Sequence, residues 1–174
     1  MPPETDSLLP PDIVALAQRV IDENRSLGRT VALAESCTGG MVAAALTEIA
    51  GSSSVLDRGF VTYSNEAKQE LLGVSMDVID AVGAVSVATA WSMAQGALAH
   101  SRADVAVAIT GIAGPDGGSE QKPVGTVVFA RAQRGQNPEE IMAETRLFDQ
   151  CRTRGAVRHQ ATLCALELLL PVTE

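Results

Sequence analysis

Short apolar runs of β-strand type alternate with segments of helical periodicity along most of this chain of 174 residues. Between about Asp12 and Leu27, apolar side chains recur every three or four residues, which predicts an amphipathic helix that ends at Gly28. The apolar run Thr30–Glu35 follows at once and is predicted to be a strand. Such an alternation is typical of a mostly parallel sheet that is covered by helices on both faces.

The same alternation continues to the carboxyl end. Further strands are predicted in the segment RGFVTYS and over Asp104–Gly111, Val124–Ala132 and Ile141–Phe148. Further helices are predicted in MVAAALTEIAG, in NEAKQELLG and over Val87–His100 and Thr153–Leu170. Because the last two strands follow each other without a helix, some antiparallel pairing is expected. We therefore expect an α/β fold, a three-layer α/β/α domain over residues 12–174 with a mostly parallel, mixed sheet of about five strands, after a loose lead-in at residues 1–11.

The net charge of −8 argues against nonspecific binding to nucleic acid, which needs a basic surface. Any anionic ligand would be held by a few local donors. The chain shows neither a signal peptide nor an apolar run of about 18 residues, which predicts a cytoplasmic protein away from the membrane.

The three cysteines are odd in number and lack zinc-ligand spacing. Cys164 lies in an apolar helical pattern and is expected in the core. Cys37 lies inside a loop motif, where it is either reactive or a small space-filling residue. The two histidines, His100 and His159, are far apart in sequence and have no acidic partner at ligand spacing, so no metal site is expected.

Two loops rich in glycine follow predicted strands. In AESCTGGMVA, the residues Ser36, Thr38, Gly39 and Gly40 precede a helix, where they could either cradle an anion or simply cap the helix. In ITGIAGPDGGSE, the strand ends at Thr110, and four glycines follow with Pro115 and Asp116. This second loop is either a long turn or a ligand-binding segment. Ligands of open α/β sheets bind beyond the carboxyl ends of the parallel strands, so both loops are expected at one crevice.

A third segment, GSSSVLDRGFVTYSNEAK, holds the only tyrosine, Tyr63, and one of only two lysines, Lys68. Lys68 falls in the opening turn of a predicted helix, where the partial positive charge of the helix disfavours an ammonium group. A neutral lysine can take the proton of a serine nucleophile. The alternative interpretation is an ordinary surface lysine.

Arg154 and Arg158 are four residues apart at the start of the last predicted helix. They therefore share a helix face and could grip a phosphate together. A solvated helix face is the usual explanation of such a pair.

Together, AESCTGG, GSSSVLDRGFVTYSNEAK, GAVS and ITGIAGPDGG…KPVGTV resemble the CinA C-terminal domain family, the nicotinamide-nucleotide amidohydrolases, from about Val14 to Leu170. Members are also called competence- or damage-inducible proteins. The resemblance implies an α/β/α fold with a mixed five-stranded sheet, a stand-alone amidohydrolase form and a dimer. It also implies hydrolysis of nicotinamide mononucleotide to nicotinate mononucleotide and ammonia, without a metal or organic cofactor.

Carried over residue by residue, the resemblance implies Ser53 as nucleophile, Lys68 as general base and Tyr63 as the group that orients the pair or relays its proton. The resemblance further implies a substrate pocket lined by Ser36, Thr38, Gly39, Gly40, Thr110 and Gly111, with Arg154 near the phosphate. Ser36 remains an alternative nucleophile, because it sits at a strand-to-helix turn.

Two other functions stay open at this point. One is an amidase or esterase that acts on another phosphorylated small molecule with the same residues. The other is a non-catalytic nucleotide-binding or regulatory module, in which the two glycine-rich loops bind a ligand and Lys68 is an exposed lysine of no special role.

Overall fold

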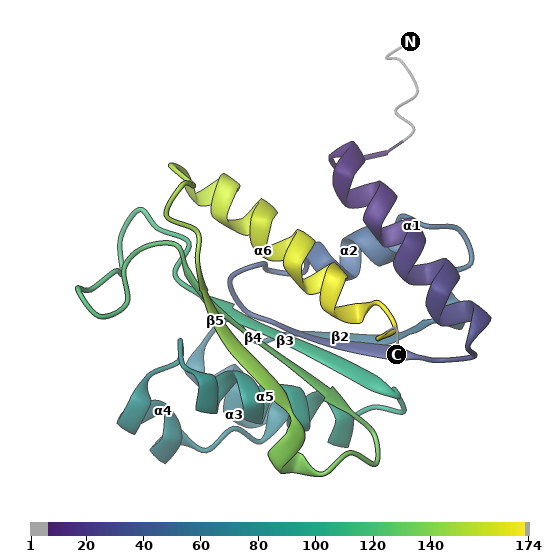
Figure 1. The fold of residues 1–174 in the computed structure, drawn as a ribbon. Helices are drawn as coiled ribbons and strands as arrows, with labels where there is room; N and C mark the ends of the chain where they lie inside the picture. Colours follow the sequence, from purple (N-terminus) through teal and green to yellow (C-terminus); the bar gives the residue numbers. More distant parts are fainter. Residues whose placement is uncertain (1–6, 173–174) are drawn as a thin grey trace.

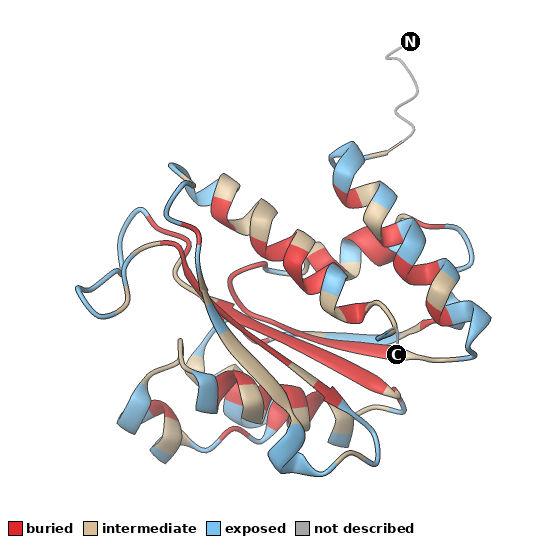
Figure 2. Cartoon of the chain, in the orientation of Figure 1, coloured by how far each residue is buried: buried red, intermediate tan, exposed pale blue. Residues whose placement is uncertain are grey.

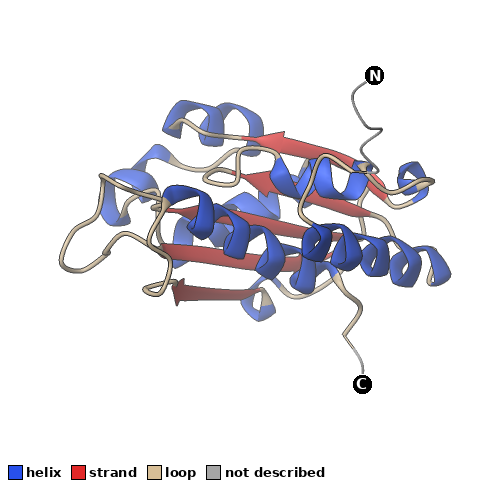
Figure 3. Ribbon diagram, turned by 90° about the horizontal axis from the view of Figure 1, so that it is seen from above, coloured by secondary structure: helices blue, strands red, loops and turns tan. Residues whose placement is uncertain are grey.

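A computed structural model describes residues 7–172 as one five-stranded sheet between two layers of helices (Figures 1 and 3). Part of the predicted lead-in, residues 1–6, lies outside the described residues, as do residues 173–174. In chain order the elements are α1 (Pro11–Ser26), β1 (Val31–Glu35), α2 (Met41–Thr47), a 3-10 turn η1 (Ser52–Ser54), β2 (Leu56–Val61), α3 (Asn65–Leu72), α4 (Met76–Val82), α5 (Val87–Ala99), β3 (Val105–Gly111), β4 (Thr126–Gln133), a 3-10 turn η2 (Pro138–Glu140), β5 (Met142–Leu147) and α6 (Arg154–Leu169).

The strand order is β2-β1-β3-β4-β5. β1 pairs in parallel with β2 and β3, whereas β4 runs antiparallel to both of its neighbours. The predicted mixed α/β/α architecture is therefore confirmed. The short helix α4 was not predicted, and α2 ends at Thr47, earlier than the predicted Gly51.

The two faces of the sheet carry side chains of different size. The face under α1, α2 and α6 buries large side chains such as Leu33, Ile109 and Phe129. The opposite face, under α5, buries mainly alanines, namely Ala32, Ala34, Ala106, Ala108, Ala130 and Ala132. Small residues on both surfaces let the alanine-rich helix α5 lie close to the strands, so that a core with few aromatic residues is still filled. Figure 2 shows the central strands buried from both sides.

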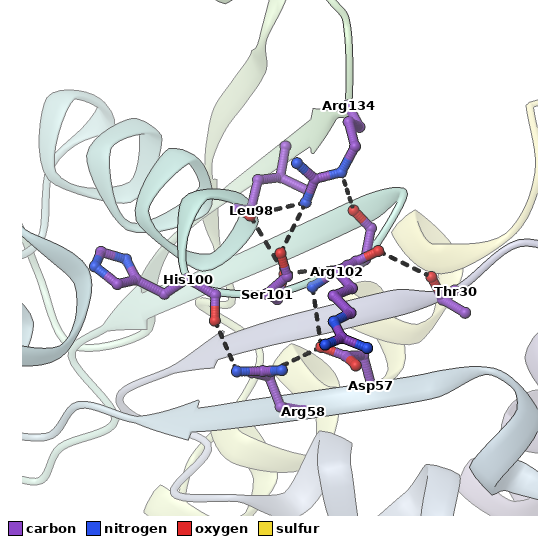
Figure 4. Close-up of polar contacts among 9 residues, drawn as sticks. Thr30, Asp57, Arg58, Leu98, His100, Ser101, Arg102 and Arg134 are labelled. Atoms are coloured by element: carbon purple, nitrogen blue, oxygen red, sulfur yellow. Dashed lines mark hydrogen bonds and ion pairs between the residues drawn. The ribbon is translucent and has the colours of Figure 1, made fainter.

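Near the amino ends of the parallel strands, arginine side chains donate hydrogen bonds to backbone carbonyl groups (Figure 4). Arg134 Nη2 donates to the carbonyl oxygens of Leu98 and Ser101 at 2.8 and 3.1 Å, and Arg58 Nη1 donates to His100 O at 2.9 Å. These donors bind carbonyl groups at and just beyond the carboxyl end of α5, where a helix leaves its last carbonyls short of partners. Arg58 and Arg134 are thus engaged in structural contacts at this end of the sheet. Ligands of open α/β sheets bind at the other end, beyond the carboxyl ends of the parallel strands.

Within residues 7–172 no helix is long and apolar enough to cross a membrane. The same residues contain no group of three or more His, Cys, Asp and Glu side chains that could hold a metal ion.

Candidate active site

A pocket of about 260 Å³ opens at the carboxyl ends of β1, β2 and β3. The pairing register places Glu35 beside both Val61 and Ile109, so β1 and β2 end at the same level and β3 extends two residues further. The pocket is lined by Ser36, Cys37, Tyr63, Asn65, Lys68, Ala84, Val85, Thr110, Gly111, Ile112, Ala113, Gly114, Asp116, Gly117 and Arg154. The loops expected at one crevice therefore do meet there.

Lys68 lies at the base of this pocket, and only 1% of its surface is exposed. It belongs to α3, whose first turn is fixed by Ser64, because the Ser64 side chain accepts a hydrogen bond from the backbone N–H of Ala67. The Lys68 Nζ donates to Ser36 Oγ at 3.1 Å, to Thr62 O at 2.9 Å and to Tyr63 O at 3.4 Å. The interpretation of Lys68 as an exposed surface lysine is therefore wrong.

All three acceptors around Lys68 are neutral, and the described part of the chain offers it no ion pair. Burial without a counterion disfavours the ammonium form and lowers the pKa of Lys68 below 10.5. A lysine that is neutral in part of the population has a lone pair that can accept a proton. The hydroxyl best placed to supply that proton is Ser36.

Ser53 is not near Lys68. It lies in η1, before β2, where the neighbouring Val55 O accepts a hydrogen bond from Val31 N at the start of β1. Because β1 and β2 are parallel, Ser53 lies at the amino end of the sheet, about 17 Å of strand away from the residues that follow β2. The expected Ser53–Lys68 pair is therefore corrected, and the serine beside Lys68 is Ser36, the alternative that the sequence had left open.

The loop of Ser36 is shaped by the buried carboxylate of Glu35. Its Oε2 accepts from the backbone N–H groups of Gly40 and Val42 at 3.0 and 3.2 Å, and its Oε1 accepts from Ala43 N at 2.9 Å. The first N–H groups of α2 are thus occupied by an anion of the protein itself. Neither interpretation left open for this helix start holds, because Glu35 occupies these N–H groups and neither Ser36 nor Thr38 caps the helix. Gly39 and Gly40, at φ of 60° and 98°, form the turn that brings α2 onto Glu35.

Thr38 and Arg158 also serve this loop and do not line the pocket. Arg158 donates to Cys37 O at 3.0 Å and to Thr38 O at 3.1 Å, so it does not join Arg154 in the pocket as the four-residue spacing had suggested. Thr38 is fully buried, and its hydroxyl has no hydrogen-bond partner within residues 7–172. Cys37 is buried, and burial raises the pKa of its thiol to about 12, so its thiolate form is disfavoured at neutral pH.

Tyr63 and Arg154 meet at the mouth of the pocket. The Tyr63 side chain is 62% exposed, and its hydroxyl accepts from Arg154 Nη2 at 2.9 Å. Arg154 Nη1 donates to Gly114 O at 2.7 Å. Arg154 therefore bridges the end of β2 and the glycine-rich loop, and both of its acceptors are neutral groups that an anionic ligand could replace.

Thr110 and Gly111 form the floor on the β3 side. The Thr110 hydroxyl donates to Ala84 O at 2.9 Å, which holds the GAVS segment against the pocket. A Cβ atom at Gly111 would lie 2.8 Å from Val127 Cγ2 and 3.0 Å from Thr126 O, so a larger residue would displace β4. Both residues are at the pocket, as predicted.

Several lining residues were not singled out as site residues from the sequence, among them Asn65, Ala84, Val85 and Asp116. Asp116 had a visible signal, because it is the charged residue of a loop otherwise made of glycine, proline and apolar residues up to Gly118. Ala84 and Val85 carry no chemical signal of their own, and Ala84 is held at the pocket by the hydrogen bond from Thr110.

The chain that forms this pocket belongs to the CinA C-terminal domain family. The match to the family covers residues 13–173. The chain is 51% identical over 159 residues to the nicotinamide-nucleotide amidohydrolase PncC of Escherichia coli K12. The aligned region covers 91% of this chain and 93% of the relative. It is 45% identical over 164 residues to a CinA-like protein of Shewanella loihica, which covers 94% of this chain but 38% of that longer relative.

Solved structures give the same result. The chain superposes on the competence/damage inducible protein CihA of Agrobacterium tumefaciens with a TM-score of 0.88 at 51% identity, over 94% of this chain and 96% of the other. The family and fold that the motifs implied are therefore confirmed.

Proposed function

We propose that this chain is a nicotinamide-nucleotide amidohydrolase that converts nicotinamide mononucleotide and water to nicotinate mononucleotide and ammonia. The observation that carries the proposal is the contact of 3.1 Å between Lys68 Nζ and Ser36 Oγ at the base of a strand-end pocket. The names of relatives that are 51% identical support the substrate. A pocket of about 260 Å³ lies just below the range of about 300–1,000 Å³ of most ligand sites, which favours a mononucleotide over a dinucleotide.

The proposed reaction begins when neutral Lys68 takes the proton of Ser36 Oγ, which attacks the carboxamide carbon. The developing oxyanion is stabilised by backbone N–H groups of the pocket, with Cys37 N, directly after the nucleophile, as the first candidate. The Lys68 ammonium then returns its proton to the departing nitrogen, and the C–N bond breaks to give ammonia and an ester on Ser36. Water attacks this ester while Lys68 takes one of its protons. The ester bond then breaks as the Lys68 ammonium gives that proton to Ser36 Oγ, and the acid that is formed releases its own proton to solvent to give the carboxylate.

Arg154 is proposed to bind the phosphate. A phosphate carries more negative charge than the Tyr63 hydroxyl or the Gly114 carbonyl that Arg154 contacts without ligand, so it would form the stronger, charge-assisted hydrogen bonds. The Tyr63 hydroxyl would then be released at the mouth of the pocket, where it can orient the bound substrate.

The test is ammonia release from nicotinamide mononucleotide by wild type, Ser36→Ala and Ser53→Ala. Ser53 is the matched control, since it is an exposed serine at the opposite end of β2. We expect Ser53→Ala to keep wild-type turnover and Ser36→Ala to lose at least about a thousandfold, as removal of a nucleophile does in other serine hydrolases. Turnover that survives in Ser36→Ala but not in Ser53→Ala would reject the mechanism, and no ammonia from wild type would reject the function.

Comparison of substrates tests the role of the phosphate. Nicotinamide riboside and free nicotinamide lack it, so both should be poorer substrates than the mononucleotide. In an Arg154→Ala variant the preference for the mononucleotide over the riboside should shrink.

Three further expectations stay predictions: that residues 12–174 act as a single domain, that the protein is cytoplasmic, and that it forms a dimer. Sedimentation velocity of the purified chain would measure its assembly, with a single species of twice the 18.1 kDa chain mass as the expected result.

A further inference from the structure

Asp116 is the only carboxylate among the residues that line the pocket. It follows Pro115 in the loop between β3 and β4, and its side chain is exposed. Within residues 7–172 it forms no ion pair, and no side-chain hydrogen bond of Asp116 is present. The pocket therefore contains a negative charge for which the described part of the protein supplies no partner.

The loop that carries Asp116 is held in place on both sides. On one side, Arg154 donates to Gly114 O at 2.7 Å. On the other, Lys122 Nζ donates to Val82 O at 2.7 Å, and Gly125 N donates to Ile112 O at 2.8 Å where the loop closes. The Asp116 carboxylate is thus presented from an anchored segment.

Asp116 and Arg154 line the same pocket but do not pair with each other. Arg154 is directed to Tyr63 Oη and Gly114 O. Two opposite charges that are kept apart in one pocket complement a ligand that carries both charges at separate places. The proposed substrate is such a ligand, since its phosphate is negative and its pyridinium ring is positive.

We propose that Asp116 is a specificity-determining residue that recognises the positive charge of the ring, so that the site selects N-ribosyl pyridinium amides over uncharged amides of the same shape. This inference rests on the proposed function for the identity of the ligand. It assigns the ring cation to Asp116, as the phosphate is assigned to Arg154.

The test uses two ligands that differ in ring charge. Nicotinamide mononucleotide has a cationic ring, and its 1,4-dihydro form has a neutral ring with the same carboxamide, ribose and phosphate. Binding is measured by calorimetry at mildly alkaline pH in the Ser36→Ala background, so that neither ligand is consumed. Asp116→Asn removes the charge and keeps the shape, and Glu120→Gln, an exposed acid of the same loop that does not line the pocket, is the control.

We expect Asp116→Asn to weaken binding of the cationic ligand by about two- to fivefold, the range of exposed ion pairs, and to leave the dihydro ligand unchanged. The difference should shrink as salt is added. The control variant should bind both ligands as its parent does.

Equal weakening of both ligands would overturn the inference, because Asp116 would then recognise the ribose hydroxyls. No change with either ligand, or no binding of the mononucleotide, would overturn it as well. Ammonia release by wild type is scored separately. A wild type that releases no ammonia, with ring-charge selectivity that still depends on Asp116, would reject the proposed reaction and keep the binding site.

Discussion

The carboxylate of Glu35 can be tested as the element that holds the nucleophile loop. It is buried, and it accepts three backbone hydrogen bonds from the start of α2, at Gly40, Val42 and Ala43. Glu35→Gln keeps the size and shape of the side chain. However, it replaces one acceptor oxygen with an amide group that only donates.

The structure sets the size of the effect. In its best orientation, the Gln oxygen would keep the two N–H groups now bound to Oε2 and leave Ala43 N facing another donor. One buried N–H without a partner costs about 1–3 kcal/mol, and loss of charge from the other two bonds costs about 1 kcal/mol each. We therefore expect Glu35→Gln to lower the free energy of unfolding by about 3–5 kcal/mol.

Urea denaturation followed by circular dichroism measures this loss. With a slope of about 2 kcal/mol per molar urea, the midpoint should fall by roughly 1.5–2.5 M. Glu66→Gln is the matched control, since Glu66 is an exposed acid in the first turn of α3, where only the helix dipole contributes, by less than about 1 kcal/mol. Turnover measured well below the transition should also fall in Glu35→Gln, because Ser36 is the next residue. A stability within 1 kcal/mol of wild type would refute this account of the loop.

Two other predictions concern Lys68 and the helical glycines. Because the folded state lowers the pKa of Lys68, the unfolded chain binds the extra proton between that pKa and 10.5, and wild-type stability rises with pH over this window. The free energy of unfolding of Lys68→Met relative to wild type should therefore increase as pH falls from about 10.5. Wild-type kcat/KM should rise with pH and reach half its maximum below pH 10.5. Parallel stability curves for the two proteins, or a kcat/KM that does not change with pH, would contradict this account. A Cβ atom at Gly96 in α5 would overlap the backbone carbonyl of Leu72, whereas at Gly155 in α6 the nearest atom, Thr153 Oγ1, is 4.0 Å away. In urea titrations, Gly96→Ala should thus lower the free energy of unfolding by about 1–3 kcal/mol or more, and Gly155→Ala should raise it by up to about 1 kcal/mol. Equal effects of the two substitutions would show that the space around each glycine does not determine the change in stability.

Much of the architecture could be predicted because it depends on local patterns. The buried parallel strands β1 and β3 are continuous apolar runs, and the helices between them show helical spacing. The helix α4 was missed because seven residues span only two turns, too few to repeat an apolar pattern. The helix α2 ends at Thr47, before the predicted Gly51, because Ile49 N donates to Leu46 O in a tight turn and does not continue the helix.

The site was predicted less completely, because its key contacts depend on strand direction. Ser53 is closer to Lys68 in sequence than Ser36 is, but β2 lies between Ser53 and Lys68 and carries the chain to the other end of the sheet. The charge at the end of an otherwise apolar strand, Glu35, was a usable signal. Its meaning, an internal partner for the start of α2, follows only from the folded loop.

Burial of Lys68 carries a free-energy cost that points to a functional site. A buried lysine loses its hydration, and the three neutral acceptors around it compensate only in part. An apolar side chain of similar length would fill the same space without that loss, so packing alone does not explain a lysine there. What an apolar residue could not provide is a group that accepts a proton next to a serine hydroxyl, at the carboxyl ends of three strands. The cost of burying Lys68 is therefore best explained by proton transfer at Ser36, and the pH dependence of stability and of turnover should follow the same titration.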